Sequence, residues 1–308
     1  MTDAPAPERP PAPLVHLEGR APERPAWFED ALATPFETGA IEREGARIAW
    51  KAWGERGAPG VILVHGGTAH KSWWDAIGPQ VAAGGLRVVA PDLAGMGESG
   101  WREVYAMGDH ALDVRAAAED AGAFEAGKPH LFGHSFGGFV TLKAALEYGE
   151  ALAGAVILDS PIRKPEEQRG DPPPRRGGRT YPDLAAALAR FRLLPEQPCE
   201  NLWLVDHVAR TSLKQAEGGY TWWFDPSLWA KLTYERRDPE EAAANAGCPF
   251  AFVRGAQSEL CAGEVWDYMR DTFVGAPFIS VPRARHHLIL DQPLACASVI
   301  ETLARAWP

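Results

Sequence analysis

The chain has 308 residues, of which 46% are hydrophobic and 23% charged, a composition typical of a soluble globular protein with a large buried core. Its 31 Lys and Arg against 41 Asp and Glu give a formal net charge of -10, which argues against nucleic acid or an anionic membrane as the main partner. No apolar run is long enough for a membrane span and no signal peptide is visible, so we expect a cytoplasmic protein with its four cysteines reduced.

The first predicted elements lie before residue 60. Residues 1–25 are rich in proline and predict a flexible N-terminal segment. Apolar and polar residues then alternate over Ile41–Glu44 and Arg47–Trp53, on either side of Gly45. This pattern predicts an antiparallel hairpin.

Short apolar runs alternate with helix-length segments through most of the remaining chain. The predicted strands are Val61–Val64, Leu86–Ala90, His130–Phe132, Ala155–Leu158, Phe250–Val253 and Phe278–Val281. The predicted helices are Trp73–Ala83, Met107–Ala121, Phe139–Glu147, Glu264–Phe273 and Pro293–Ala306. Such alternation predicts an α/β fold, in which a mostly parallel twisted sheet carries helices on both faces.

The alternation stops between Asp159 and Cys248. Helical stretches occupy this interval instead, over Leu184–Leu193, Asn201–Leu213 and Pro226–Tyr234. We therefore expect a helical cap at residues 161–245, inserted between two strands of a core formed by residues 26–160 and 246–308.

A candidate nucleophile stands at the end of the third predicted strand, in Gly133-His134-Ser135-Phe136-Gly137. A serine between two such glycines can occupy a sharp strand-to-helix turn with its hydroxyl exposed. The backbone N–H groups at the start of the following helix can stabilise a negative charge. Ser135 is therefore predicted to attack a carbonyl.

A serine nucleophile needs a base and an oxyanion hole. His286 lies on the loop after the last predicted strand, at the sheet edge that also carries Ser135, and is the predicted base; the alternative is that His286 and His287 are surface histidines. Gly67 follows the strand Val61–Val64, and its N–H is predicted to form the oxyanion hole with that of Phe136.

The acid that orients the histidine has two candidates. Glu259 follows the strand Phe250–Val253 and is the favoured one. Asp159, at the end of the strand Ala155–Leu158, is the alternative, unless it only caps the segment that enters the insertion.

Several motifs together resemble the α/β-hydrolase superfamily in its cap-bearing branch. They are His65-Gly66-Gly67 with Trp74 nine residues after His65, the loop Pro91–Gly100, the turn at Ser135, and the tail His286–Pro293. The resemblance implies a catalytic triad of Ser135, Glu259 and His286. This chain departs from the family at two positions, because Glu259 stands where Asp is more frequent and Arg285 where Gly is common.

The predicted substrate pocket is aromatic. Trp74, Trp222 and Trp223 are expected to contact an apolar or aromatic ester, although they could instead pack the cap onto the core. Arg175, Arg176 and Arg179 form a basic group in a Pro- and Gly-rich loop. A solvated loop is the expected role of this group, and recognition of an acidic substrate group is the alternative.

The sequence thus predicts a serine hydrolase that cleaves a carboxylic ester or lactone through an acyl-enzyme, without metal or organic cofactor. Members of the fold that open epoxides or displace halide use a carboxylate nucleophile, and Ser135 stands in that place here. Carbon–carbon bond hydrolysis and a perhydrolase or haloperoxidase-like activity on the same triad are alternatives. A ligand receptor with vestigial hydrolysis is a further one.

Overall fold

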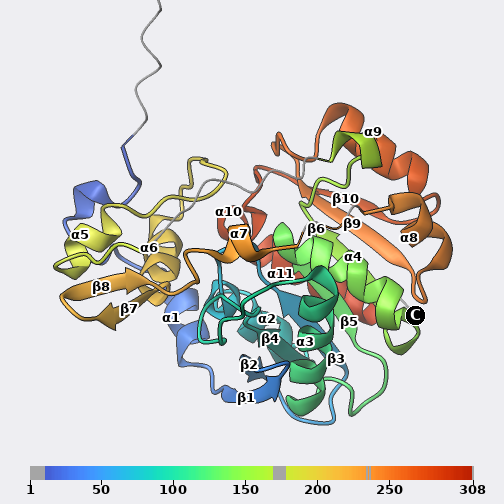
Figure 1. Ribbon diagram of the computed structural model, residues 1–308, viewed down its shortest axis with the longest axis horizontal. Coiled ribbons are helices and arrows are strands. Elements are labelled where there is room, and N and C mark those ends of the chain that lie inside the picture. The colour runs from blue at the N-terminus through green and yellow to red at the C-terminus, as the bar shows by residue number, and fades with distance from the viewer. Residues whose placement is uncertain (1–10, 169–177, 234, 236, 307–308) are drawn as a thin grey trace, which may run out of the picture.

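The computed structural model describes residues 11–168, 178–233, 235 and 237–306. One eight-stranded sheet forms the centre, in the order β1-β2-β4-β3-β5-β6-β9-β10 (Figure 1). Its strands are β1 (Glu37–Arg43), β2 (Ala46–Trp53), β3 (Gly60–Val64), β4 (Arg87–Pro91), β5 (His130–His134), β6 (Gly154–Leu158), β9 (Phe250–Gly255) and β10 (Phe278–Val281). The hairpin β1–β2 is antiparallel and β2 is antiparallel to β4, whereas all other pairs are parallel. The predicted mostly parallel sheet is confirmed.

The sheet is covered on both faces because its strands are apolar on both sides. Along β3, Val61 and Leu63 join one buried cluster, and Ile62 and Val64 join the other. Residues of α2 (Gly78–Ala83) and α11 (Pro293–Ala306) complete the first cluster. Residues of α3 (Met107–Asp120), α4 (Phe136–Tyr148) and α9 (Gly263–Thr272) complete the second.

The helix predicted over Trp73–Ala83 is divided in two. A 3₁₀ turn, η2 (Lys71–Trp74), comes first, and α2 begins at Gly78. Pro79 lies in the first turn of α2. Since proline has no N–H to donate and is tolerated only in a first helical turn, the chain starts a new helix there.

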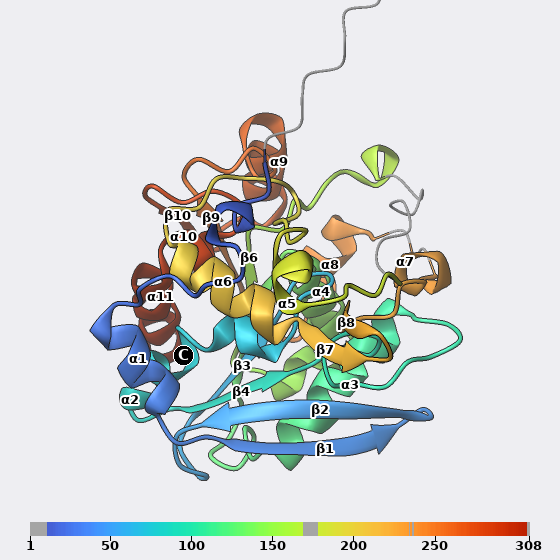
Figure 2. The ribbon, with the colours of Figure 1, turned by 90° about the vertical axis from the view of Figure 1, so that its left-hand side faces the viewer.

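Between β6 and β9 the chain leaves the sheet, and we call this part the insertion. Its elements are η4 (Pro165–Glu167), α5 (Leu184–Leu188), α6 (Leu202–Thr211), β7 (Leu213–Ala216), β8 (Gly219–Trp222), α7 (Leu228–Lys231) and α8 (Pro239–Asn245). Two of the predicted helices are much shorter than expected, and the hairpin β7–β8 was not predicted. Figure 1 shows α5, α6 and this hairpin gathered on one side of the core, away from α8 and α9, and Figure 2 shows them from that side.

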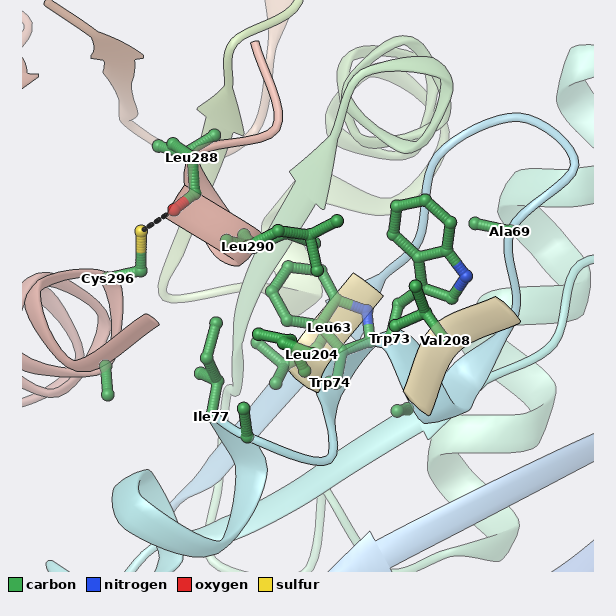
Figure 3. Close-up of a cluster of buried hydrophobic side chains, with 14 of the residues drawn as sticks. Leu63, Ala69, Trp73, Trp74, Ile77, Leu204, Val208, Leu288, Leu290 and Cys296 are labelled. Atoms are coloured by element: carbon green, nitrogen blue, oxygen red, sulfur yellow. Dashed lines mark hydrogen bonds between the residues drawn. The ribbon is translucent and has the colours of Figure 1, made fainter. Parts of the chain in front are cut away.

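Helix α6 attaches the insertion to the core through apolar packing. Leu204 and Val208 of α6 belong to the same buried cluster as Trp73, Trp74 and Ile77 (Figure 3). Trp74 has no exposed surface. Burial of this much apolar surface favours a fixed position of α6 over the core.

A buried polar network makes a second attachment. Asp75 of the core accepts hydrogen bonds from Lys51 Nζ (2.7 Å) and from His207 Nε2 of α6 (3.0 Å). Burial disfavours the carboxylate, but the hydrogen bond from His207 and the charge of Lys51 outweigh it and lower the pKa of Asp75. The carboxylate therefore stays charged and holds both partners.

Part of the N-terminal segment that was expected to be flexible packs on the insertion. Leu14, in the turn before η1 (Val15–Leu17), is buried, and Arg210 Nη2 of α6 donates to the Gly19 carbonyl over 2.7 Å. In α1 (Ala26–Ala33), Trp27 meets Trp203 of α6 edge to face. Leu14 and Gly19 are thus in contact with the fold, and residues 1–10 lie outside the described part.

Three short elements complete the fold: η3 (Gly149–Ala151), which follows α4, α10 (Leu288–Asp291), and the loop from β10 to α10 that carries His286. The four cysteines form no disulfide. None of the helices in the described ranges combines the length and the apolar character that crossing a bilayer requires.

Candidate active site

Ser135 lies on a strained turn between β5 and α4. Its backbone has φ 54° and ψ -117°, a conformation that non-glycine residues rarely adopt. Hydrogen bonds with the end of β6 and with Ser160 just after it fix the turn: Ser135 N donates to the Leu158 carbonyl (2.9 Å), and Ser160 Oγ donates to the Ser135 carbonyl (2.7 Å). The sharp turn predicted from the sequence is present.

The glycines beside the turn are needed for close packing. A Cβ added to Gly133 would overlap the Gly137 carbonyl oxygen, and one added to Gly137 would lie 2.5 Å from the carbonyl oxygens of Val64 and His65. Side chains at either position would push α4 away from the sheet. The spacing of the motif therefore follows from the local geometry.

His286 links Ser135 to a carboxylate. Its Nε2 lies 3.0 Å from Ser135 Oγ, and its Nδ1 lies 3.0 Å from Asp159 Oδ1. With the proton on Nδ1, the ring donates to Asp159 and accepts from the serine hydroxyl, the arrangement in which a histidine can act as general base. Asp159 and His286 are buried, while Ser135 is partly exposed.

The structure brings Asp159, the alternative acid, and not the favoured Glu259, to hydrogen-bond distance of His286. Glu259 is exposed on the turn after β9, whereas Asp159 is 1% exposed and directly follows β6. A turn at Asp159, whose φ is 48°, aims its carboxylate at the loop that carries His286. Glu259 has a longer side chain than an aspartate, but this side chain is exposed to solvent and is not hydrogen-bonded to His286.

The loop after β9 still contributes to the site, because it holds the acid. Gly255 N donates to Asp159 Oδ2 over 2.7 Å, and Ser258 Oγ donates to Oδ1 over 2.6 Å. Together with His286 these donors satisfy a buried carboxylate that would otherwise be costly. Sequence reasoning missed Ser258 and also Ser160; the only signal was a serine close to each candidate acid.

Gly67 and Phe136 lie next to each other beside Ser135. A Cβ placed on Gly67 would be 3.5 Å from Phe136 Cβ and 2.7 Å from the ring of Trp229 in α7. Phe136 opens α4, where backbone N–H groups have no acceptor within the helix. Gly67 and Phe136 thus lie together near the serine, where the residues of an oxyanion hole must be placed.

His65 connects two loops beside the site through hydrogen bonds. Its Nδ1 donates to the Gly66 carbonyl (2.8 Å), and its Nε2 accepts from Leu93 N (3.0 Å). Burial lowers the pKa of His65, so the ring stays neutral and keeps this tautomer. It joins the loop of Gly67 to the loop after β4.

In the described part of the chain, one group of side chains has its potential metal-ligand atoms close enough together to bind an ion, and it consists of three histidines. The ligand atoms of His134, His286 and His287 lie within 4.8 Å of one another. Burial lowers the pKa of His134 to about 3, and that of His287 falls well below its usual value. However, both nitrogens of His286 serve Ser135 and Asp159, so a metal ion here would compete with the triad for the ring.

A cavity of about 690 Å³ opens over Ser135, between the core and the insertion. Trp73, Phe191, Trp222 and Phe224 give it aromatic walls, and His287 lines it as well. Of the three tryptophans predicted to bind substrate, only Trp222 lines the cavity. Trp74 is enclosed in the core, where Figure 3 shows it beside Leu63 and Leu204, and its neighbour Trp73 lines the cavity in its place. Trp223 is not part of the lining.

The sequence model that describes the Alpha/beta hydrolase family matches residues 61–299 of this chain. The chain belongs to this family. The strand order and the turn at Ser135 agree with the resemblance found in the sequence.

Among relatives of this hydrolase, esterase Rv0045c of Mycobacterium tuberculosis is 26% identical over 285 residues, covering 84% of this chain and 87% of the esterase. A haloalkane dehalogenase of Mycobacterium marinum is 30% identical over 142 residues, or 44% of this chain and 47% of that protein. The chain spans about half the length, or less, of the first relatives it matches. In structure, a thioesterase domain from the curacin biosynthetic pathway superposes with a TM-score of 0.72 at 23% identity, over 87% of this chain and 99% of that domain.

Proposed function

We propose that this protein is a serine hydrolase that cleaves a carboxylic ester or lactone through an acyl-enzyme. The observation that carries the proposal is the unbroken hydrogen-bonded series from Ser135 through His286 to Asp159, at the floor of a cavity with aromatic walls. The similarity to an esterase over 84% of the chain supports it.

In the first half-reaction, Ser135 Oγ attacks the carbonyl carbon while His286 Nε2 accepts the hydroxyl proton. The N–H groups of Gly67 and Phe136 stabilise the oxyanion, and Asp159 stabilises the imidazolium. When the tetrahedral intermediate collapses, the leaving alcohol takes the proton from His286 and the acyl group stays on Ser135.

In the second half-reaction, water replaces the alcohol. His286 removes a proton from the water, the resulting hydroxide attacks the acyl carbon, and Ser135 recovers its proton as the acid leaves. The reaction needs no group besides the triad and the two N–H donors.

Halide displacement and epoxide opening are disfavoured even though relatives include enzymes named for them. Those reactions need a carboxylate nucleophile, whereas a hydroxyl stands at position 135. Carbon–carbon bond hydrolysis is the second candidate, supported by 38% identity over 107 residues to 2-hydroxy-6-oxo-6-phenylhexa-2,4-dienoate hydrolase of Burkholderia cepacia, which covers 36% of that protein.

Steady-state hydrolysis of p-nitrophenyl butyrate, octanoate and benzoate tests the proposal. We expect turnover by the wild-type protein and its loss in Ser135→Ala, with Ser298→Ala, at an exposed serine of α11, as a matched control that retains turnover. If all three esters are inert and a dienoate with a vinylogous 1,5-diketone is consumed, the carbon–carbon candidate replaces the esterase. Binding of an ester without its consumption would favour a receptor.

A further inference from the structure

The rim of the cavity is positively charged although the protein as a whole is acidic. Among the described residues that line the cavity, three are arginines (Arg179, Arg190 and Arg192) and none is Asp or Glu. The formal net charge of the chain is -10. The local excess of positive charge is therefore not a reflection of overall composition.

The three arginines differ in their partners. Arg192 Nη1 is paired with Glu196 at 3.0 Å, which neutralises it. Arg179 and Arg190 are exposed, and within the described ranges neither has a carboxylate at ion-pair distance. Arg179 and Arg190 thus line the cavity with positive charges that no carboxylate of the described residues neutralises.

The other titratable groups in the lining add no negative charge. The pKa of His134 is lowered to about 3 by burial and by the neighbouring His286, and burial likewise lowers the pKa of His287. Both rings are neutral near pH 7. The remaining lining side chains are aromatic, aliphatic or hydroxylic, such as Tyr181, Phe191 and Trp222.

The arginines that line the cavity are close in the chain to the residues that form its aromatic wall. Phe191 separates Arg190 from Arg192 in the chain, and its ring lies 5.9 Å from that of Trp222. The ring of Trp222 lies 6.1 Å from that of Tyr181, two residues after Arg179. A ligand along this wall would place an apolar portion on the rings and an acidic portion within reach of the guanidinium groups.

We propose that the preferred substrates are esters whose acyl portion ends in a carboxylate, joined to the scissile carbonyl by an apolar linker, and that Arg179 and Arg190 bind this carboxylate. The inference rests on the proposed function, because it assigns the substrate class of the same site. Arg175 and Arg176 of the basic loop lie outside the described residues and are not needed for it.

A matched pair of substrates tests the proposal: the mono-p-nitrophenyl ester of adipic acid and p-nitrophenyl hexanoate, which differ only in the terminal carboxylate. We expect the wild-type protein to favour the adipate ester in kcat/KM. Arg179→Gln and Arg190→Gln should each lower that preference about fivefold, mainly through KM. The control Arg115→Gln removes an exposed arginine of α3 that is paired with Glu119 outside the cavity, and should leave the preference unchanged.

Salt gives a second readout. Raising the ionic strength should reduce the wild-type preference for the adipate ester but not the smaller preference of the double variant, which combines Arg179→Gln and Arg190→Gln. An equal preference in wild type and double variant, with both esters hydrolysed in a Ser135-dependent manner, would overturn the substrate class and leave the hydrolase intact. Failure to hydrolyse either ester would count against both proposals.

Discussion

Ser258 Oγ donates a 2.6 Å hydrogen bond to Asp159 Oδ1, so the loop after β9 holds an acid that is supplied by the end of β6. The acid and its support thus come from neighbouring strands of the sheet. His286, on the loop after β10, completes the arrangement by binding the same carboxylate oxygen.

Exchanging the two candidate acids tests this arrangement. Asp159→Asn should lower kcat by about 10⁴-fold, because the amide favours the wrong histidine tautomer and does not stabilise the imidazolium. Glu259→Gln should change kcat less than twofold, since this side chain is exposed. Ester hydrolysis by the two variants measures both effects. The reverse pattern would restore Glu259 as the acid.

Ser258 is expected to act by positioning Asp159. Ser258→Ala should lower kcat about tenfold, because one charge-assisted hydrogen bond to the carboxylate is lost while that from Gly255 remains. Ser258→Thr keeps the hydroxyl and should recover most of the activity. Equal losses of kcat in the two variants would argue for a steric effect in place of positioning.

Substitutions of the adjacent residues Trp73 and Trp74 should affect different properties, substrate preference and stability respectively. Trp74→Ala leaves a cavity in the core and should lower the free energy of unfolding by about 3–5 kcal/mol, measured by urea titration. Trp73→Ala enlarges the substrate cavity and should raise kcat/KM for octanoate relative to butyrate. If Trp74→Ala alone changed the chain-length preference, the assignment of these two side chains would be wrong.

Buried neutral histidines should make the fold sensitive to acid. Burial lowers the pKa of His110 to about 3, and neither ring nitrogen has a hydrogen-bond partner among the described residues. The unfolded chain binds a proton at this ring below about pH 6.5 and the folded chain does not, so stability falls as the pH decreases from about 6.5 toward 3.

The contribution of His110 can be isolated by substitution. Between pH 7 and 5 it amounts to about 2 kcal/mol of the loss in unfolding free energy. His110→Phe removes the titrating group while keeping an aromatic ring against Tyr105 and Phe136. Urea denaturation of this variant at both pH values should show a smaller decrease than the wild type. An unchanged decrease would mean that His110 is protonated in the folded state.

The core of the fold was predictable because its signals are local. Runs such as Val61–Val64 and Ala155–Leu158 have the length and apolar character of buried strands, and each lies in the sheet as predicted. The turn at Ser135 and the position of His286 were likewise predictable, since a glycine spacing and a strand end determine them.

The acid was not predictable in the same way, because the choice between Asp159 and Glu259 depends on side-chain direction. Both follow neighbouring strands, and only the turn at Asp159, with its positive φ, aims one of them at His286. The hairpin β7–β8 was missed although Gly218 and Gly219 mark its turn, since its strands are short and partly exposed.

The most direct test of the account is labelling with a fluorophosphonate probe, followed by mass spectrometry of the labelled peptide. Wild-type protein should carry the probe on Ser135 and on no other serine, Ser135→Ala should carry none, and Asp159→Asn should react much more slowly than Glu259→Gln. Absence of labelling in folded wild-type protein, or labelling that persists in Ser135→Ala, would contradict the assignment of Ser135 as an activated nucleophile.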